Sequence, residues 1–223
     1  MLQENDLAKL YKLRFSDSDS LKKNPIWEVL CKHFFQKWVR TTDTVIDLAS
    51  GQGEFINNIT STKRIALDFN PDAKNYLDSD IEFHFGKAQK MTDNLGPEIG
   101  DILFTSNFLE HLQNKEELDT VLEQIKTVLK PGGRFLIMGP NLRYLAGKYW
   151  DYYDHHLGLT HLSLSEALRL KDFEIETCID KFLPYTTKSK LPQFPWLVWL
   201  YLKLPFAWRI LGKQFFIVAK KTK

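Results

Sequence analysis

Residues 45–55 read VIDLASGQGEF, an apolar run that passes directly into a glycine-bearing turn. The first part has the continuous apolar character of a strand buried on both faces. Gly51 and Gly53 carry no side chain that would keep a ligand away from the backbone. In an open α/β sheet, a turn at the carboxyl end of such a strand lies where ligands bind. The stretch therefore predicts a strand, a ligand-binding turn and then a helix.

Similar apolar runs recur along the chain and alternate with segments of helical periodicity. We expect strands at residues 44–50, 63–69, 81–87, 101–107, 133–139, 173–182 and 214–219. Alternation at this spacing favours a parallel sheet covered by helices. The predicted class is therefore α/β, with a Rossmann-like, seven-stranded, mostly parallel sheet, helices on both faces and an antiparallel seventh strand.

Two Asn-Pro pairs predict helix starts, since asparagine caps helices and proline suits the first helical position. They are Asn24-Pro25 and Asn70-Pro71. A stripe of apolar residues over 118–129 predicts a further helix, which Pro131 and the two glycines after it would end.

Length and composition fit one globular domain. The chain has 223 residues, of which 43% are hydrophobic and 26% charged, so a disordered chain is excluded. Cys31 and Cys178 form no CxxC pair, and a zinc ribbon is not expected. The first residues show no basic segment followed by an apolar run, so a cytoplasmic location is the expectation.

A second acidic residue supports a cofactor site. Asp68 ends the second expected strand, where its carboxylate could accept hydrogen bonds from two ribose hydroxyls. The pyrophosphate-binding fingerprint G-x-G-x-x-G is not met, because Ile56 stands at the third glycine position after Gly51 and Gly53, and Ala49 precedes them. A cofactor with a ribose but no pyrophosphate fits this turn better than a dinucleotide.

Further stretches follow in a fixed order along the chain. They are residues 47–53 at the first turn, Asp68, Lys87-Ala88-Gln89 after the third strand, residues 101–112 (DILFTSNFLEHL) around the fourth, and residues 129–135 (LKPGGRF) before the fifth. In this order and spacing they resemble the motifs of the class I S-adenosylmethionine-dependent methyltransferases. Ala49 departs from the glycine that is usual at the first motif.

The resemblance implies S-adenosyl-L-methionine as the cofactor and a set of residues that bind it. That set is Asp47, Ala49, Ser50, Gly51, Gly53, Asp68, Phe69, Ala88, Gln89, Asn107, Phe108 and His111. Two members have structural alternatives, because His111 could be a core histidine and Asn107 a turn residue. On this interpretation the chain is one methyltransferase domain over residues 1–223, with a helical extension at 1–43. Residues 140–172 and 183–212 would be insertions or a lid on the acceptor side.

A histidine pair follows the fifth strand, where the methyl acceptor would bind. His155 and His156 lie next to Asp151 and Asp154. A hydroxyl acceptor benefits from a base with a pKa near neutrality, and a histidine oriented by an aspartate is such a base. We predict His155 or His156 as the catalytic residue, and the sequence does not choose between them. A structural hydrogen bond is the alternative, and no further ligand spacing supports a metal site.

The end of the chain is aromatic and basic. After Asp180 there are nine lysines and arginines and no acidic residue, although the net charge of the whole chain is only +2. Residues 194–211 are apolar, but Lys203, Pro205 and Arg209 within them argue against a membrane-spanning helix. Two alternatives stay open: a lid packed on the domain, or peripheral contact with anionic lipid.

This segment and the histidine pair also resemble methyltransferases of bacterial surface-polysaccharide and glycolipid pathways. That resemblance implies O-methylation of a sugar or a lipid-linked glycan, or of another small molecule. A nicotinamide-dependent oxidoreductase or epimerase is an alternative, although the unmet glycine fingerprint speaks against it. A cofactor-binding module without catalysis is another. Nucleic acid is not an expected partner, since residues 107–110 read NFLE and not Asn/Asp-Pro-Pro-aromatic. The oligomeric state is not predicted.

Overall fold

The computed structural model describes residues 17–185 and 194–222, so part of the predicted extension and residues 186–193 of the predicted lid lie outside the described residues. The sheet has seven strands in the order β3-β2-β1-β4-β5-β7-β6. They are β1 (Thr44–Leu48), β2 (Lys63–Asp68), β3 (Glu82–Phe85), β4 (Gly100–Ser106), β5 (Leu129–Pro140), β6 (Phe173–Ile179) and β7 (Gln214–Lys221). β1 to β5 are parallel, and β7 runs antiparallel to both β5 and β6. The predicted fold class is therefore confirmed.

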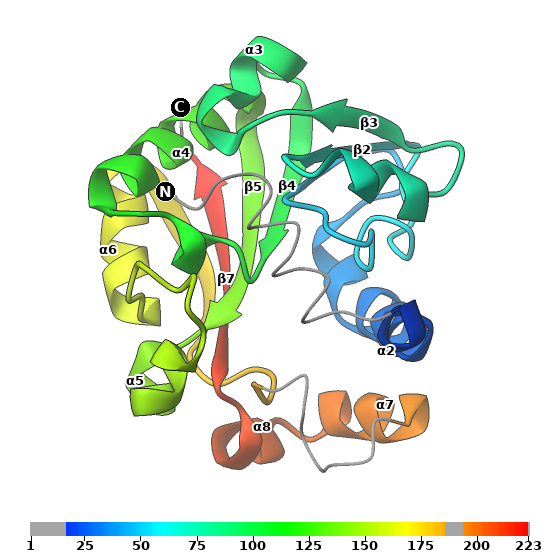
Figure 1. Cartoon of the computed structure of the whole chain (residues 1–223), viewed down its shortest axis with the longest axis vertical. Helices are drawn as coiled ribbons and strands as arrows, with labels where there is room; N and C mark the ends of the chain where they lie inside the picture. Colours follow the sequence, from blue (N-terminus) through cyan, green and yellow to red (C-terminus); the bar gives the residue numbers. More distant parts are fainter. Residues whose placement is uncertain (1–16, 186–193, 223) are drawn as a thin grey trace.

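Helices cover both faces of this sheet (Figure 1). They are α2 (Asp17–His33), α3 (Met91–Leu95), α4 (Lys115–Val128), α5 (Leu142–Leu145), α6 (His161–Leu170), α7 (Pro195–Lys203) and α8 (Pro205–Leu211). Short 3₁₀ helices are η1 (Phe35–Trp38), η2 (Pro71–Tyr76), η3 (Ala88–Lys90), η4 (Leu109–His111) and η5 (Ala146–Asp151). All the connections that carry the predicted site lie at the carboxyl ends of the parallel strands.

Two apolar cores lie on opposite faces of the sheet, because successive residues of a strand point to opposite sides. In β4, Leu103 joins the core under α4 and α6, whereas Ile102 and Phe104 join the core under α2 and η1. The apolar stripe of α4 is buried as its periodicity predicts. α6 is also part of the first core, so the predicted insertion 140–172 includes one helix that covers the sheet.

Three local expectations need correction. Pro25 lies inside α2 and not at its start, because the helix begins at Asp17. β5 begins at Leu129, so Pro131 and its glycines lie within the strand, where the pairing with β4 shifts register between Gly100 and Ile102. Asn70 caps as predicted and accepts from the Asp72 N–H, but the helix that follows is the 3₁₀ helix η2.

The helix expected after the glycine turn is not formed. Residues 54–59 make turns with separate i→i−4 bonds, Asn57 N–H to Gly53 O and Ile59 N–H to Phe55 O. The asparagine side chains compete with a helix, since Asn57 Nδ2 donates to Tyr76 O and its Oδ1 accepts from the Asp78 N–H. The segment is thereby fastened to the loop after β2.

Candidate functional site

The turn after β1 has an unusual backbone that brings the predicted cofactor residues together. Ala49, Gly51 and Gly53 have φ of 58°, 56° and 73°, in the left-handed region that favours glycine. The carboxylate of Asp68 joins this turn to the end of β2. Its Oδ2 accepts from the Gly51 N–H at 2.8 Å and its Oδ1 accepts from the Asn70 N–H at 2.7 Å. The structure therefore places the first motif and the second acidic residue side by side.

Acidic side chains are buried under this turn. Burial raises the pKa of Asp47 well above its ordinary value, and the nearby carboxylates of Glu54 and Asp68 raise it further. Burial also raises the pKa of Asp68. Ser50 Oγ is buried without a hydrogen-bond partner among the described residues. A ligand with a positive charge and hydroxyl groups suits such a site, because it would stabilise the ionised carboxylates and could bond to the free serine oxygen.

Three residues of the predicted cofactor set, Phe69, Ala88 and Gln89, lie between β2 and α4 in the sequence. Phe69 stacks on Phe85 with ring centroids 5.9 Å apart, and Lys87 Nζ lies 4.9 Å from the centre of the Phe69 ring. Ala88 is buried at the start of η3. Gln89 has a further contact, since its side-chain amide donates to the Glu117 carboxylate of α4. That bond fastens η3 to α4, so the Gln89 side chain has a structural contact in addition to its predicted role.

The loop after β4 carries the remaining predicted cofactor residues. Asn107 has φ of 50°, which asparagine tolerates better than most residues, and its N–H donates to Met138 O of β5. Its side chain donates to Ser106 Oγ at 2.9 Å. Phe108 packs on the core under α4. These contacts hold the loop rigidly at the carboxyl ends of β4 and β5.

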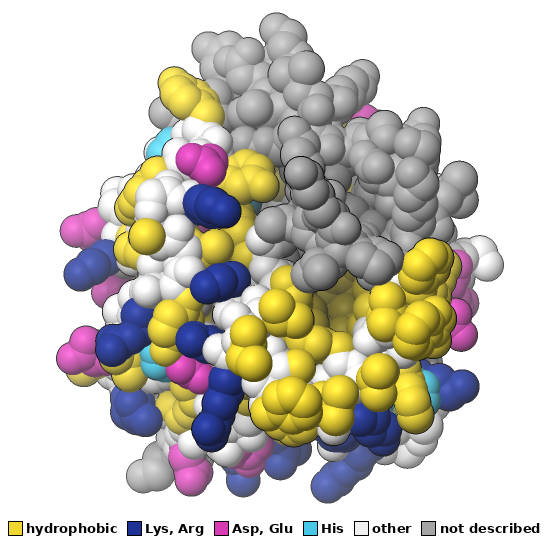
Figure 2. All heavy atoms as spheres, turned by 90° about the horizontal axis from the view of Figure 1, so that it is seen from below, with side chains coloured by type: hydrophobic (Ala, Val, Ile, Leu, Met, Phe, Trp, Pro, Cys, Tyr) yellow, Lys and Arg dark blue, Asp and Glu magenta, His cyan; other side chains and the backbone are white. Residues whose placement is uncertain are grey.

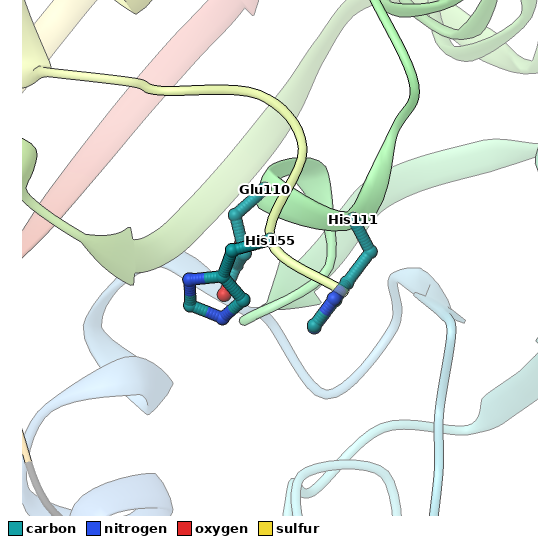
Figure 3. Close-up of side chains that lie close together, drawn as sticks. All are labelled: Glu110, His111 and His155. Carbon is teal, nitrogen blue, oxygen red and sulfur yellow. The ribbon is translucent and has the colours of Figure 1, made fainter. Parts of the chain in front are cut away.

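Two histidines and a glutamate gather just beyond this loop (Figure 3). Glu110 and His111 belong to η4, and His155 comes from the segment after η5. One ligand atom from each residue lies within 4.8 Å of the others. The ring centroids of His111 and His155 are 5.0 Å apart, and Tyr152 stacks on His155 at the same centroid distance. This cluster is the part of the described chain with both acid–base and cation-binding chemistry.

The electrostatics of the cluster are unusual for so buried a site. Burial raises the pKa of Glu110 to about 7, although His111 opposes this effect. Burial by itself would lower the pKa of His111, but the hydrogen bond with Asp154 and the charge of Glu110 outweigh it and raise that pKa. His111 Nδ1 lies 3.3 Å from Asp154 Oδ2 and 3.0 Å from Asp154 O. In this network of two acids and two imidazoles, Glu110, Asp154 and His155 are buried and His111 is partly exposed.

The predicted histidine pair is divided by the structure. His155 is buried in the cluster, at 7% exposed, whereas His156 is exposed. Asp154, one of the two aspartates expected beside the histidine pair, is paired with His111. The N–H of His156 and the N–H of the next residue both donate to Glu110 O, which holds this segment against η4.

Two residues of this site were not predicted. Glu110 looked like an ordinary part of a loop motif, and only its position before His111 in that motif could have drawn attention to it. Tyr149 is fully buried, and its hydroxyl donates to Leu157 O at 2.5 Å and accepts from the Leu159 N–H at 3.3 Å. It closes the loop that carries His155, a role that one isolated tyrosine in a sequence does not reveal.

Comparison with known proteins identifies the family of this chain. A family model described as a methyltransferase domain matches residues 40–181. Among solved structures, a chain of the complex between the Haloferax volcanii Trm112 methyltransferase activator and the putative methyltransferase is similar, with a TM-score of 0.68 and 19% identity over 96% of this chain and 97% of that one. An S-adenosylmethionine-dependent methyltransferase from Archaeoglobus fulgidus has a TM-score of 0.63 and 20% identity over 97% and 100%. A search of curated protein sequences finds no significant match.

The structural likeness, at these identities, concerns the fold. The family match covers more than half of the chain and includes the β1 turn, the end of β2 and the loop after β4. A nicotinamide-dependent oxidoreductase is not favoured by any of these findings. The chain belongs to the methyltransferase domain family.

Proposed function

We propose that this methyltransferase methylates a hydroxyl oxygen of a sugar or of a lipid-linked glycan. The observation that carries the proposal is the buried acid–imidazole cluster at the carboxyl end of β4, beside the loop that ends with Phe108. S-adenosylmethionine supplies an electrophilic methyl group on a cationic sulfur. A hydroxyl group is a poor nucleophile near neutral pH, so it needs the help that such a cluster gives.

For the cofactor, we propose the predicted residue set. Asp68 would accept from the ribose hydroxyls, since a carboxylate that receives two backbone N–H groups still has lone pairs to offer. The turn of residues 49–53 would take the methionine part, near the charge of Asp47. Phe69 and Ala88 would border the adenine. Asn107, Phe108 and His111, from the loop after β4, would complete the cofactor site. The fit to a cationic cofactor rests on the buried, mutually repelling carboxylates of Asp47 and Asp68.

For the catalytic base, we retain His155 and His156. His156 is exposed and therefore reachable by an acceptor in the mouth of the site, whereas His155 is enclosed by Tyr149 and Tyr152. Replacing the base should lower kcat by about 10²–10⁴-fold and leave S-adenosylmethionine affinity unchanged. Single alanine variants at the two positions, assayed for kcat and for cofactor binding, separate the candidates. If both variants lose only a little kcat, and lose it equally, neither histidine is the base.

A surface at the same end of the molecule supports a lipid-linked acceptor. α7 and α8 lie beyond the carboxyl ends of the parallel strands (Figure 1), and α7 packs on α2. Large apolar side chains on and beside these helices are at least 40% exposed: Phe194, Trp196, Trp199, Leu200, Phe206, Ile210 and Leu211. We call this surface the α7–α8 face. Figure 2 shows apolar side chains gathered there with lysine and arginine side chains around them.

We propose that the α7–α8 face binds an anionic membrane surface. Tryptophan and phenylalanine insert at the headgroup level of a membrane. Lys203 and Arg209 are exposed and would attract anionic lipid headgroups. No acidic residue follows Asp180 to oppose this attraction. A lid packed on the domain would bury these side chains, and in the described residues only Leu202 of α7 is buried. No helix of residues 17–185 or 194–222 is long and apolar enough to cross a membrane.

The acceptor is tested by transfer of radiolabelled methyl groups. The purified protein is incubated with labelled S-adenosylmethionine and with lipid-linked or free sugars. We expect label on a sugar hydroxyl as a methyl ether, which survives the mild base that would hydrolyse a methyl ester, and no label with Asp68→Ala. Binding of S-adenosylmethionine without transfer to any of these acceptors would contradict the sugar assignment and leave the enzyme class intact.

The membrane contact is tested by vesicle sedimentation. We expect the protein to sediment with phosphatidylglycerol vesicles and not with phosphatidylcholine vesicles, and to be released by salt. The double variant Phe206→Ser/Ile210→Ser should bind at least about 10-fold more weakly, because each buried side chain contributes about 1–2 kcal/mol. Leu162→Ser/Leu170→Ser, on exposed positions of α6, is the matched control. Equal binding by both variants, or none by the wild type, would contradict the proposal. A protein partner, such as the activator of the Haloferax volcanii complex, would then be tested on this face.

A further inference from the structure

We propose that Glu110, His111 and His155 bind one divalent transition-metal ion. The three side chains converge from two segments 45 positions apart in sequence, η4 and the loop after η5 (Figure 3). None of the family resemblances assigns them this role. The inference deepens the proposed function, because a cation here would lie where the acceptor hydroxyl is expected.

The geometry needs only small adjustments to bind an ion. The ligand atoms lie within 4.8 Å of one another, whereas atoms around a shared Zn²⁺ at about 2.0–2.2 Å are roughly 3–3.5 Å apart. Closing that difference takes small rotations of the imidazole and carboxylate groups. The backbone is already in place, since the N–H groups of His156 and Leu157 donate to Glu110 O at 3.0 and 3.1 Å. Those bonds fix the distance between the two ligand-bearing segments.

His111 has the outer contact that metal-bound histidines characteristically show. Its Nδ1 faces the carboxylate and the backbone carbonyl of Asp154, at 3.3 and 3.0 Å. Such a partner holds the proton on Nδ1, orients the ring and leaves Nε2 as the ligand atom. The His111 side chain is 31% exposed, which gives an ion an entry path and leaves coordination positions open to a substrate.

Glu110 provides the second, independent observation. The residue is 2% exposed, and its Oε1 has no hydrogen-bond partner among the described residues. An unpaired carboxylate oxygen in the interior is costly, and proteins normally pair such a group. A cation bound to the Glu110 carboxylate would pair this oxygen. Its positive charge would favour the ionised carboxylate, whereas burial alone favours the protonated form.

The ligand set also selects the class of ion. Two imidazoles and one carboxylate suit Zn²⁺, Mn²⁺, Fe²⁺ or Co²⁺, whereas Mg²⁺ and Ca²⁺ prefer oxygen ligands alone. An ion at this position would polarise a hydroxyl oxygen bound to it. His155 would then be a ligand, and His156 would be the base of the proposed pair.

The direct test measures metal binding without any assay of activity. The full chain is stripped with a chelator and titrated with Zn²⁺ and Mn²⁺, and bound metal is counted after gel filtration. We expect one equivalent per chain, a visible Co²⁺ spectrum with nitrogen ligands, and no saturable Mg²⁺ binding. Glu110→Gln and His155→Asn should weaken binding at least about 100-fold. His156→Ala, the exposed neighbour, is the matched control and should bind metal as the wild type does.

The readouts separate this inference from the proposed function. Glu110→Gln removes a buried acidic group whose Oε1 has no hydrogen-bond partner among the described residues, so the metal-free variant should melt no lower than the metal-free wild type. Only the wild type should gain stability with Zn²⁺. S-adenosylmethionine binding, measured on the same samples, should be equal in both. Absence of stoichiometric metal in the wild type, or equal binding by Glu110→Gln, would overturn the metal site while leaving the methyltransferase assignment in place.

Discussion

At the scale of single residues, Ala49 is strained by its own backbone. Its φ of 58° brings Cβ close to the backbone, which costs an L-residue about 1–2 kcal/mol. Ala49→Gly removes that strain, and the greater freedom of glycine in the unfolded chain offsets about 0.5–1 kcal/mol. We expect unfolding in urea to show a stability equal to or slightly above that of the wild type. Ala49→Val should lose about 2 kcal/mol, since branching at Cβ worsens the same contact. A valine variant as stable as the glycine variant would exclude strain at this turn.

If Asp47 and Asp68 bind the cofactor as proposed, its affinity should depend on pH. Their folded-state pKa values are raised above 3.8, so they stabilise the ligand-free fold at acid pH and lose that contribution as pH rises through the raised values. A cationic ligand favours the ionised carboxylates, so affinity for S-adenosylmethionine should increase over the same pH range. Asp68→Asn should bind about 10-fold or more weakly and show a flatter pH dependence, because it lacks a charged acceptor. Calorimetric titration at several pH values checks this. If the affinity of the variant changes with pH as steeply as that of the wild type, Asp68 is not the source of the pH dependence.

At the scale of elements, the sequence predicts strands better than helix boundaries. Strands buried on both faces are nearly continuous apolar runs, and every one of the seven expected runs overlaps an observed strand. Helix starts depend on local competition. Pro25 carries a start signal yet lies inside α2, and the asparagines after Gly53 bond to neighbouring loops and prevent a regular helix. Such contacts with distant parts of the chain are not visible in a sequence window.

The loop that carries His155 depends on one buried hydroxyl. Tyr149 OH bonds to Leu157 O and to the Leu159 N–H, and the ring packs 5.0 Å from that of His155. Tyr149→Phe leaves two buried backbone groups unpaired, so we expect a loss of about 1–3 kcal/mol in urea unfolding. Methyl transfer should fall while S-adenosylmethionine affinity stays the same, because the cofactor turn is on other elements. Tyr153→Phe, at a position 78% exposed, is the matched control and should change neither quantity.

At the scale of the whole molecule, the predicted site divides into two parts. The grouping of the proposed cofactor residues was predictable because they directly follow strands, and the carboxyl ends of parallel strands meet at one edge of the sheet. The acceptor side was only partly predictable. His155 was named from its neighbours in sequence, whereas its observed neighbours Glu110 and His111 lie about 45 positions away. Asp154 was expected beside that histidine and instead holds His111. Only the folded chain determines which of several histidines an acid contacts.

Binding of S-adenosylmethionine should therefore stabilise the whole domain, because its proposed site joins the turn after β1, the end of β2 and the loop after β4. A ligand that binds only the native state at 100 times its Kd adds about 2.7 kcal/mol. For a chain of this length each kcal/mol shifts Tm by about 2–4 °C, so we expect a rise of roughly 5–10 °C. Differential scanning fluorimetry with S-adenosylmethionine, with NAD as a negative control, measures it. Hydrogen exchange should slow at all three connections together. Protection confined to one of them would mean that these segments do not form a single site.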